Sequence, residues 1–155
     1  MNVTYVQLSY IHFQLKSLNQ TVGKKGERAL MIDLAKQFNS PPEMYPFFDF
    51  FRWVISSPRD FKELLQCYAQ KQGYSLDYAH SAFPRDIDPA EEAVFEDSIR
   101  FLVAYGRNND HEVIVPYDMV YDYLRQFTVF YLNDHPHDKT EIKHLLEAVK
   151  KALLT

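Results

Sequence analysis

The stretch from Val94 to Leu132 constrains the fold most strongly, because its hydrophobic pattern changes period twice. In its first part, large apolar residues alternate with other residues, which is typical of a strand with one buried face. The alternating residues are Ile99, Phe101, Val103 and Tyr105. A β-branched run at 113–115 follows the loop GRNND, whose length suits a hairpin. The pattern therefore predicts two antiparallel strands, at about 98–105 and 111–115.

A helix is predicted directly after the second strand. Pro116 cannot donate a hydrogen bond to a β-ladder, but it is acceptable in the first turn of a helix. Beyond it, apolar and aromatic residues recur at helical spacing. They are Val120, Leu124, Phe127 and Tyr131. The hairpin should therefore lead straight into an amphipathic helix.

Apolar stripes predict further helices before this stretch. We expect one at about 1–20 and another at 31–38, where apolar residues fall at i, i+3, i+4 and i+7. The segment MYPFFDFFRWVI, at 44–55, is a strongly apolar helix. Its start lies either at Ser40, which has a carboxylate three residues on, or a turn later at Pro46.

Two more helices have recognisable ends. Ser57 and Asp60 predict the start of a helix that Gly73 can terminate. Its buried stripe is Phe61, Leu64, Leu65 and Tyr68. The last helix is predicted to begin near Asp138, in a capping box with Glu141. Its apolar face is Ile142, Leu145, Leu146, Val149 and Leu153.

The segment from Tyr74 to Ala93 has no sustained period, and its prolines and acids predict a long surface connection, a kind of loop that tends to carry function. Between Asp77 and Asp97 the sequence has seven acids against Arg85 alone. The acids are Asp77, Asp86, Asp88, Glu91, Glu92, Glu96 and Asp97. They form either a solvated loop or a docking face for a basic protein.

Length and composition predict one globular domain over residues 1–155, of the α+β class, mostly helical, with the hairpin packed on helices. The net charge of −4 argues against nucleic acid as a partner, because phosphate binding needs clustered Lys and Arg. A single cysteine and an N-terminus without signal-peptide order favour the cytoplasm. No apolar run reaches the roughly 18 residues of a membrane helix, so we expect no membrane contact.

No spacing in the sequence selects a catalytic or metal-binding site. His135 and His137, flanked by aspartates, are the best metal candidates, but polar residues are also expected in a turn between helices. Cys67 is either a structural thiol on or near the buried stripe of its helix or a nucleophile. The structural role is favoured, because no nearby His or Lys is evident that would lower the pKa of the thiol. The fold could bring scattered histidines together as a ribonuclease-like pair. These are His12, His80 and His111. We expect no enzyme, no cofactor and no metal.

Four segments follow one another in a distinctive order. They are NSPPEMYPFFDFFRWVI, FEDSIRFLVAY, EVIVPYDMVYDYL and YLNDHPHDKTEIKHLLEAV. This order resembles the immunity proteins of bacterial contact-dependent growth inhibition, over about residues 38–153. The resemblance implies a small cytoplasmic protein that binds and neutralises the C-terminal domain of a cognate toxin, often a ribonuclease. It implies neither catalysis nor a small-molecule substrate.

A toxin that acts on RNA presents a basic cleft, which an acidic surface can cover or dock beside, and exposed tyrosines would supply anchors. The expected toxin-binding residues are Asp77, Asp86, Asp88, Glu91, Glu92, Glu96, Asp97, Tyr117, Asp118 and Tyr121. Two other functions stay open on the residues alone. One is a small hydrolase that uses the scattered histidines and acids, and the other is a helical adaptor that binds a protein other than a toxin.

Overall fold

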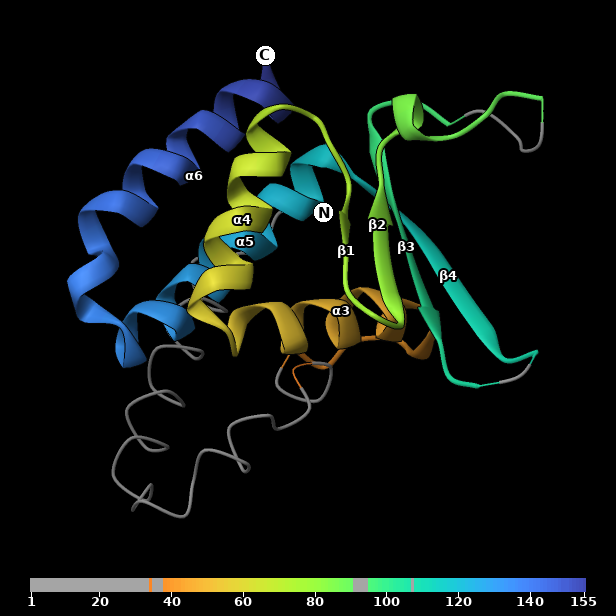
Figure 1. The fold of residues 1–155 in the computed structure, drawn as a ribbon, viewed down its shortest axis with the longest axis horizontal. Helices are drawn as coiled ribbons and strands as arrows, with labels where there is room; N and C mark the ends of the chain where they lie inside the picture. The colour runs from red at the N-terminus through yellow and green to blue at the C-terminus, as the bar shows by residue number, and fades with distance from the viewer. Residues whose placement is uncertain (1–33, 35–37, 91–94, 107) are drawn as a thin grey trace. The chain divides into compact units, whose positions relative to one another are not determined.

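The computed structural model describes residues 34, 38–90, 95–106 and 108–155. The chain divides into two compact units, Met1–Ile32 and Asp33–Thr155, and all described residues belong to the second. Figure 1 shows the elements of this unit. Their bounds are η1 Pro42–Met44, α3 Tyr45–Ile55, α4 Pro58–Ala69, β1 Tyr74–Ser75, β2 Ala79–Ala82, η2 Pro84–Asp86, β3 Ser98–Ala104, β4 Asp110–Pro116, α5 Tyr117–Asp134, η3 Pro136–Asp138 and α6 Lys139–Leu154. The helix predicted at 1–20, and most of the one at 31–38, lie outside the described residues.

The predicted hairpin is confirmed as β3 and β4, which belong to an antiparallel sheet of order β1-β2-β3-β4. Ile99, Phe101 and Val103 are buried as predicted, and the register places Val115 opposite Ile99 on the same face. Tyr105 differs from the prediction, because it follows β3 and is 47% exposed. The α+β class, with a hairpin packed on helices, is confirmed.

The segment 74–93, predicted as an irregular connection, contains two strands and η2 instead. β1 and β2 extend the sheet beyond the hairpin, so the sheet has four strands. Ala79 and Ser81 of β2 are buried opposite Val103 and Phe101 of β3. The inward residues of β2 are small and the strands are short, so they lack the alternation of large apolar groups that identifies a strand in a sequence.

Gly73 was predicted to end a helix, and that prediction is wrong. α4 ends at Ala69, and the residue with left-handed backbone after it is Lys71, at φ 52°. Gly73 instead lies where two segments meet, because a Cβ there would be 2.2 Å from the carbonyl oxygen of Ser81. Its amide also donates to the Asp86 carboxylate at 2.9 Å. A side chain at this position would push the start of β1 away from β2.

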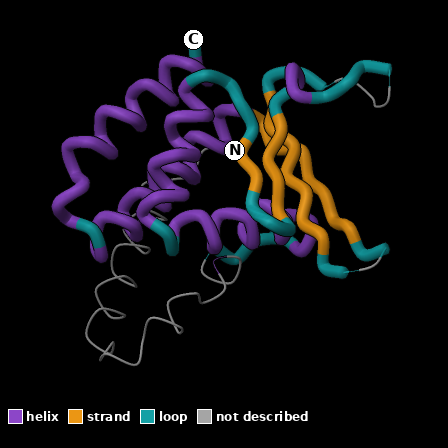
Figure 2. Tube along the Cα trace, in the orientation of Figure 1, coloured by secondary structure: helices purple, strands orange, loops and turns teal. Residues whose placement is uncertain are grey.

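The helices are arranged in layers beside the sheet. α3 and α5 both pack against β3 and β4, and α6 packs against α4 and α5. Figures 1 and 2 show α6 on the side of α4 and α5 that faces away from the strands. α3 runs across the end of the sheet where the β1–β2 and β3–β4 turns lie (Figure 1). No helix in the described part of the chain has the length and apolar character needed to cross a membrane.

Aromatic rings form the contact between the sheet and the helices. The Phe47 ring of α3 lies 4.9 Å from Phe101 of β3, and Phe51 of α3 lies 4.9 Å from Phe127 of α5. All four rings are fully buried. Edge-to-face and tilted pairs at such distances stabilise a core beyond the area they bury. These rings therefore fix α3 and α5 on the hairpin.

The helix starts follow the sequence signals in part. Ser57 caps α4, because its hydroxyl accepts the amide of Asp60 at 3.3 Å, as predicted. Of the two starts considered for α3, the later one is observed: the helix begins at Tyr45 with Pro46 in its first turn. The Ser40 hydroxyl donates to a neighbouring carbonyl and caps no helix.

Asp138 precedes α6 but does not cap it, so the predicted capping box with Glu141 is wrong. The Asp138 carboxylate accepts from the Lys62 ammonium at 2.8 Å and from the Tyr131 hydroxyl at 2.5 Å. Glu141 pairs with the same ammonium at 2.9 Å. Side-chain donors from α4 and α5 therefore engage these carboxylates in place of the backbone amides of α6. The Lys62 ammonium joins α4 to the start of α6.

We predict that Phe101→Ala lowers the free energy of unfolding by about 3 to 5 kcal/mol, because it leaves a cavity between the sheet, α3 and α5. Urea unfolding measures the loss. A change below about 1 kcal/mol would show that Phe101 does not contribute to the core as its burial indicates.

We predict that Asp138→Asn destabilises the fold in a pH-dependent way. The Lys62 ammonium, followed by the Tyr131 hydroxyl, lowers the pKa of Asp138. A lowered folded-state pKa means that the carboxylate stabilises the fold at neutral pH and that this contribution is lost as pH falls through the folded value. The variant should unfold at lower urea than the wild type at pH 7, and the difference should shrink below about pH 4. Coincident curves at pH 7 would contradict this.

Candidate functional site

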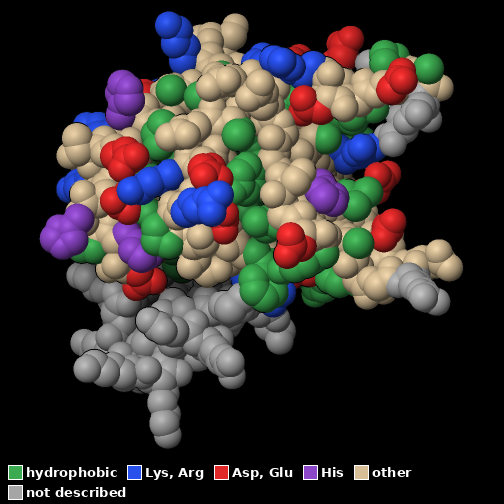
Figure 3. Space-filling view, in the orientation of Figure 1, with side chains coloured by type: hydrophobic (Ala, Val, Ile, Leu, Met, Phe, Trp, Pro, Cys, Tyr) green, Lys and Arg blue, Asp and Glu red, His purple; other side chains and the backbone are tan. Residues whose placement is uncertain are grey.

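Five of the expected acids lie together at one end of the sheet, which we call the acidic end. Its residues are Asp86, Asp88, Glu96, Asp97 and Asp118, all exposed. The first four belong to the β2–β3 connection, and the Asp97 carbonyl accepts the amide of Tyr117 at 2.9 Å, which brings the start of α5 alongside. In Figure 3, acidic side chains lie toward the upper right, interspersed with hydrophobic and basic ones. Glu91 and Glu92 lie outside the described residues.

Asp86 has a structural role that its sequence context did not reveal. Its Oδ2 accepts the amides of Gly73 at 2.9 Å and Phe83 at 2.8 Å, so one carboxylate joins the start of β1 to the end of β2. Asp88 accepts from the nearby amide of Ala90. Reversal of the charge at Asp86 would therefore disturb the fold as well as the surface.

Tyr117 and Tyr121 are buried, and the expectation that they are exposed anchors is wrong. Only 7% and 6% of their surfaces are exposed. They lie at i and i+4 on the same face of α5 as the buried Leu124, at i+7, so the helical spacing that identified the core also covers them. Burial raises the pKa of both hydroxyls.

Asp77 lies at the opposite end of the sheet from the acidic end. It is exposed in the β1–β2 turn, and the next residue, Tyr78, accepts the amide of Ala104 at the end of β3. The expected toxin-binding residues therefore do not form one surface. The structure groups most acids at one end, places Asp77 at the other and buries both tyrosines.

Near Asp77 lies a group of residues that sequence reasoning missed, which we call the aromatic surface. Its residues are Asp49, Arg52, Trp53, Tyr78 and Tyr105. The first three lie on the face of α3 opposite its buried phenylalanines, and Tyr78 and Tyr105 come from the two turns of the sheet. In Figure 3, hydrophobic side chains gather at this lower end of the sheet. The helical spacing of Asp49, Arg52 and Trp53 in an otherwise apolar helix is the signal that could have identified these three of its five residues.

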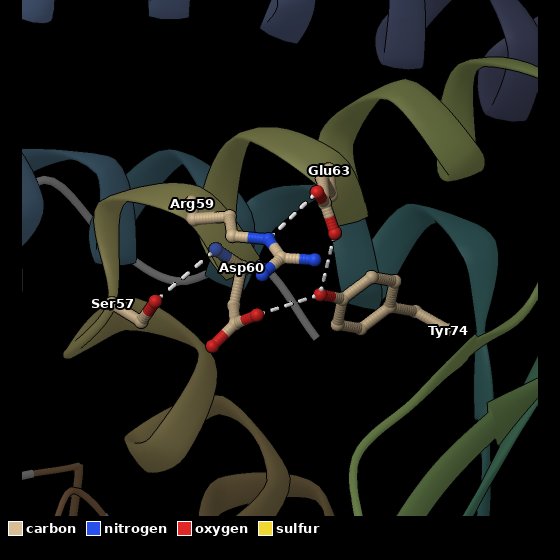
Figure 4. A network of polar contacts seen from close by, with 5 residues as sticks. All are labelled: Ser57, Arg59, Asp60, Glu63 and Tyr74. Carbon is tan, nitrogen blue, oxygen red and sulfur yellow. Dashed lines mark hydrogen bonds and ion pairs between the residues drawn. The ribbon is translucent and has the colours of Figure 1, made fainter.

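A polar network joins α4 to β1 (Figure 4). The Tyr74 hydroxyl lies 2.8 Å from the Asp60 carboxylate and 3.2 Å from that of Glu63, and Arg59 donates to Glu63 at 3.0 Å. Burial, followed by the hydrogen bond to Asp60, raises the pKa of Tyr74. A phenol that holds its proton this firmly is a poor base or nucleophile, so the network serves to fasten β1 to the helix.

Two of the three histidines considered for catalysis, His80 and His111, are separated by the sheet. His80 is paired with Leu102, whereas His111 is paired with Val103, the next residue of β3. Paired residues share a face and consecutive residues of a strand point to opposite faces, so the two imidazoles lie on opposite faces. They cannot act together on one substrate. His12 lies outside the described residues.

His135, considered as a metal ligand, and Cys67, considered as a nucleophile, do not have the neighbours that these roles require. The His135 ring packs on Tyr131 at 4.7 Å, and the nearby Asp138 is engaged by Lys62. In the part of the chain that the structure describes, no three His, Cys, Asp or Glu side chains lie close enough to hold a metal ion. Burial raises the pKa of the Cys67 thiol, and Glu63 and Asp86 raise it further, which disfavours the nucleophilic thiolate.

Comparison with known proteins shows a similar structure and a matching family. A crystal structure of an immunity protein from Neisseria meningitidis MC58 is similar, with a TM-score of 0.57 and 18% sequence identity, over 77% of this chain and 96% of that chain. The two proteins therefore share a fold. Residues 39–146 match the family described as CDI immunity protein, and the chain belongs to this family. A comparison with curated proteins finds no match.

We predict that Asp86→Ala destabilises the protein by about 1 to 2 kcal/mol, because two amides lose a charged acceptor. Glu96→Ala, at an exposed position of the same connection, is the matched control and should change stability by less than about 0.5 kcal/mol. Equal effects of the two substitutions in thermal unfolding would contradict the structural role of Asp86.

Proposed function

We propose that this protein binds the C-terminal domain of a cognate toxin in the cytoplasm and neutralises it without catalysis, and that the toxin is a ribonuclease. The observation that carries the proposal is the match of residues 39–146 to the CDI immunity family. The opposite orientations of His80 and His111 support a binding role over the hydrolase considered from the sequence.

The acidic end supports a basic partner. Asp88, Glu96 and Asp118 are exposed, and the nearby Lys71 is engaged with the Tyr117 ring at 5.2 Å. A ribonuclease must attract phosphates, so its cleft carries basic residues that such a surface complements. Complementary charge mainly raises the association rate and excludes wrong partners.

The experiment is kinetic binding to the purified cognate toxin domain, together with growth of cells that express that domain. We expect Asp88→Lys combined with Glu96→Lys to reduce the association rate by about tenfold or more at low salt, with little change in thermal midpoint. Added salt should reduce the wild-type rate, because screening acts over about 8 Å at physiological ionic strength. Asp86 is left unchanged because of its structural bonds.

The matched control is Asp122→Lys combined with Glu147→Lys, which makes the same change in net charge at exposed positions of α5 and α6. This control should retain the association rate and the protection of cells. Equal rates and equal protection in both double variants would show that the acidic end is a solvated loop. A purified toxin domain that degrades no RNA would contradict the ribonuclease part of the proposal alone.

A further inference from the structure

The aromatic surface exposes large rings that are held in fixed positions. Trp53 is 38% exposed and Tyr105 is 47% exposed, although a fold gains nothing from leaving such rings in water. The Tyr105 hydroxyl donates to the Asp49 carboxylate of α3. Its ring also lies 5.3 Å from that of His111, edge to face. Tyr105 is thus held by its hydroxyl and by its ring, although the residue remains exposed.

Trp53 is held in a similar way. Its ring meets Tyr78 edge to face at 5.6 Å, and the Arg52 guanidinium lies 5.3 Å from the ring centroid. Tyr78 is itself positioned by the sheet, since its carbonyl accepts the amide of Ala104 at 2.8 Å. Rings that are ordered before binding lose little conformational entropy when a partner covers them.

Arg52 is incompletely satisfied in the free protein. Its Nη2 lies 3.6 Å from Asp49, and its Nε is buried with no hydrogen-bond partner among the described residues. Buried donors without partners are uncommon and costly. Tryptophan, tyrosine and arginine are also the residues most enriched among the anchors of protein interfaces.

The charges around the rings identify the kind of partner. Arg52 faces Asp49, and Asp77 is exposed in the β1–β2 turn next to Tyr78. A protein with basic groups around an apolar or aromatic patch complements this surface. The acidic end lies about 20 Å away, at the other end of β3, so it is a separate contact region.

We infer that the aromatic surface is a second docking surface for the toxin domain, with Trp53 and Tyr105 as its anchors and Asp77 at its rim. The inference rests on the proposed function. It assigns the two surfaces different kinetic roles: the acidic end accelerates association, and the aromatic surface, once desolvated, sets the dissociation rate.

The experiment measures association and dissociation rates of Trp53→Ala and Tyr105→Ala with the purified cognate toxin domain. Each variant should raise Kd by about thirtyfold or more, mainly through faster dissociation. Tyr105→Phe keeps the ring but loses the bond to Asp49, and it should give a smaller increase. Val129→Ala, which truncates an exposed apolar residue of α5, is the control and should bind within twofold of the wild type.

Asp77→Lys completes the set, because it lies in an exposed turn and its replacement removes no packing. It should slow association at low salt and leave the thermal midpoint unchanged. Binding within threefold of the wild type by both alanine variants and by Asp77→Lys would overturn the inference while the proposed function stands. A wild-type protein that neither binds the toxin domain nor protects cells would overturn the proposed function, and the inference with it.

Discussion

The contact of Phe47 and Phe51 with Phe101 and Phe127 is the interaction on which the rest of the structure depends. It buries one face of the hairpin against α3 and α5, and a hairpin without such cover is at best marginally stable. Because α3 buries its phenylalanines on the sheet, its other face carries Trp53 to the end where the strands turn. The packing of α3 on the sheet therefore also fixes the position of the aromatic surface.

Sequence reasoning identified the features that depend on local periodicity. The hairpin, α5 and the Ser57 cap are confirmed, because alternation, helical spacing and capping act over a few residues. The features that depend on distant partners were missed. Asp138 accepts from Lys62, 76 positions earlier in the chain, rather than capping α6. β2 was missed because its buried residues, Ala79 and Ser81, are small. The large apolar side chains at this place in the core come from its neighbour β3.

The residues of the candidate site were likewise predicted in part. A local excess of acids predicted exposed residues, and the acids in the described part of the connection are exposed. Composition could not distinguish Asp86, whose carboxylate accepts two backbone amides, from Glu96, which lies on the surface. The spacing of Tyr117 and Tyr121 already matched the buried stripe of α5. Membership of the CDI immunity family defines the class of protein.

Amide hydrogen exchange of the chain, free and in complex with the toxin domain, shows which part of the protein the toxin covers, because it reports contact along the whole chain in one measurement. We predict slower exchange on binding in the two turns of the aromatic surface, at 75–79 and at Asn109 of the β3–β4 turn, and in the acidic end at 95–97, with the outer face of α6 unchanged. A tight complex that leaves all of these regions unchanged and slows exchange only in α6 would contradict this prediction.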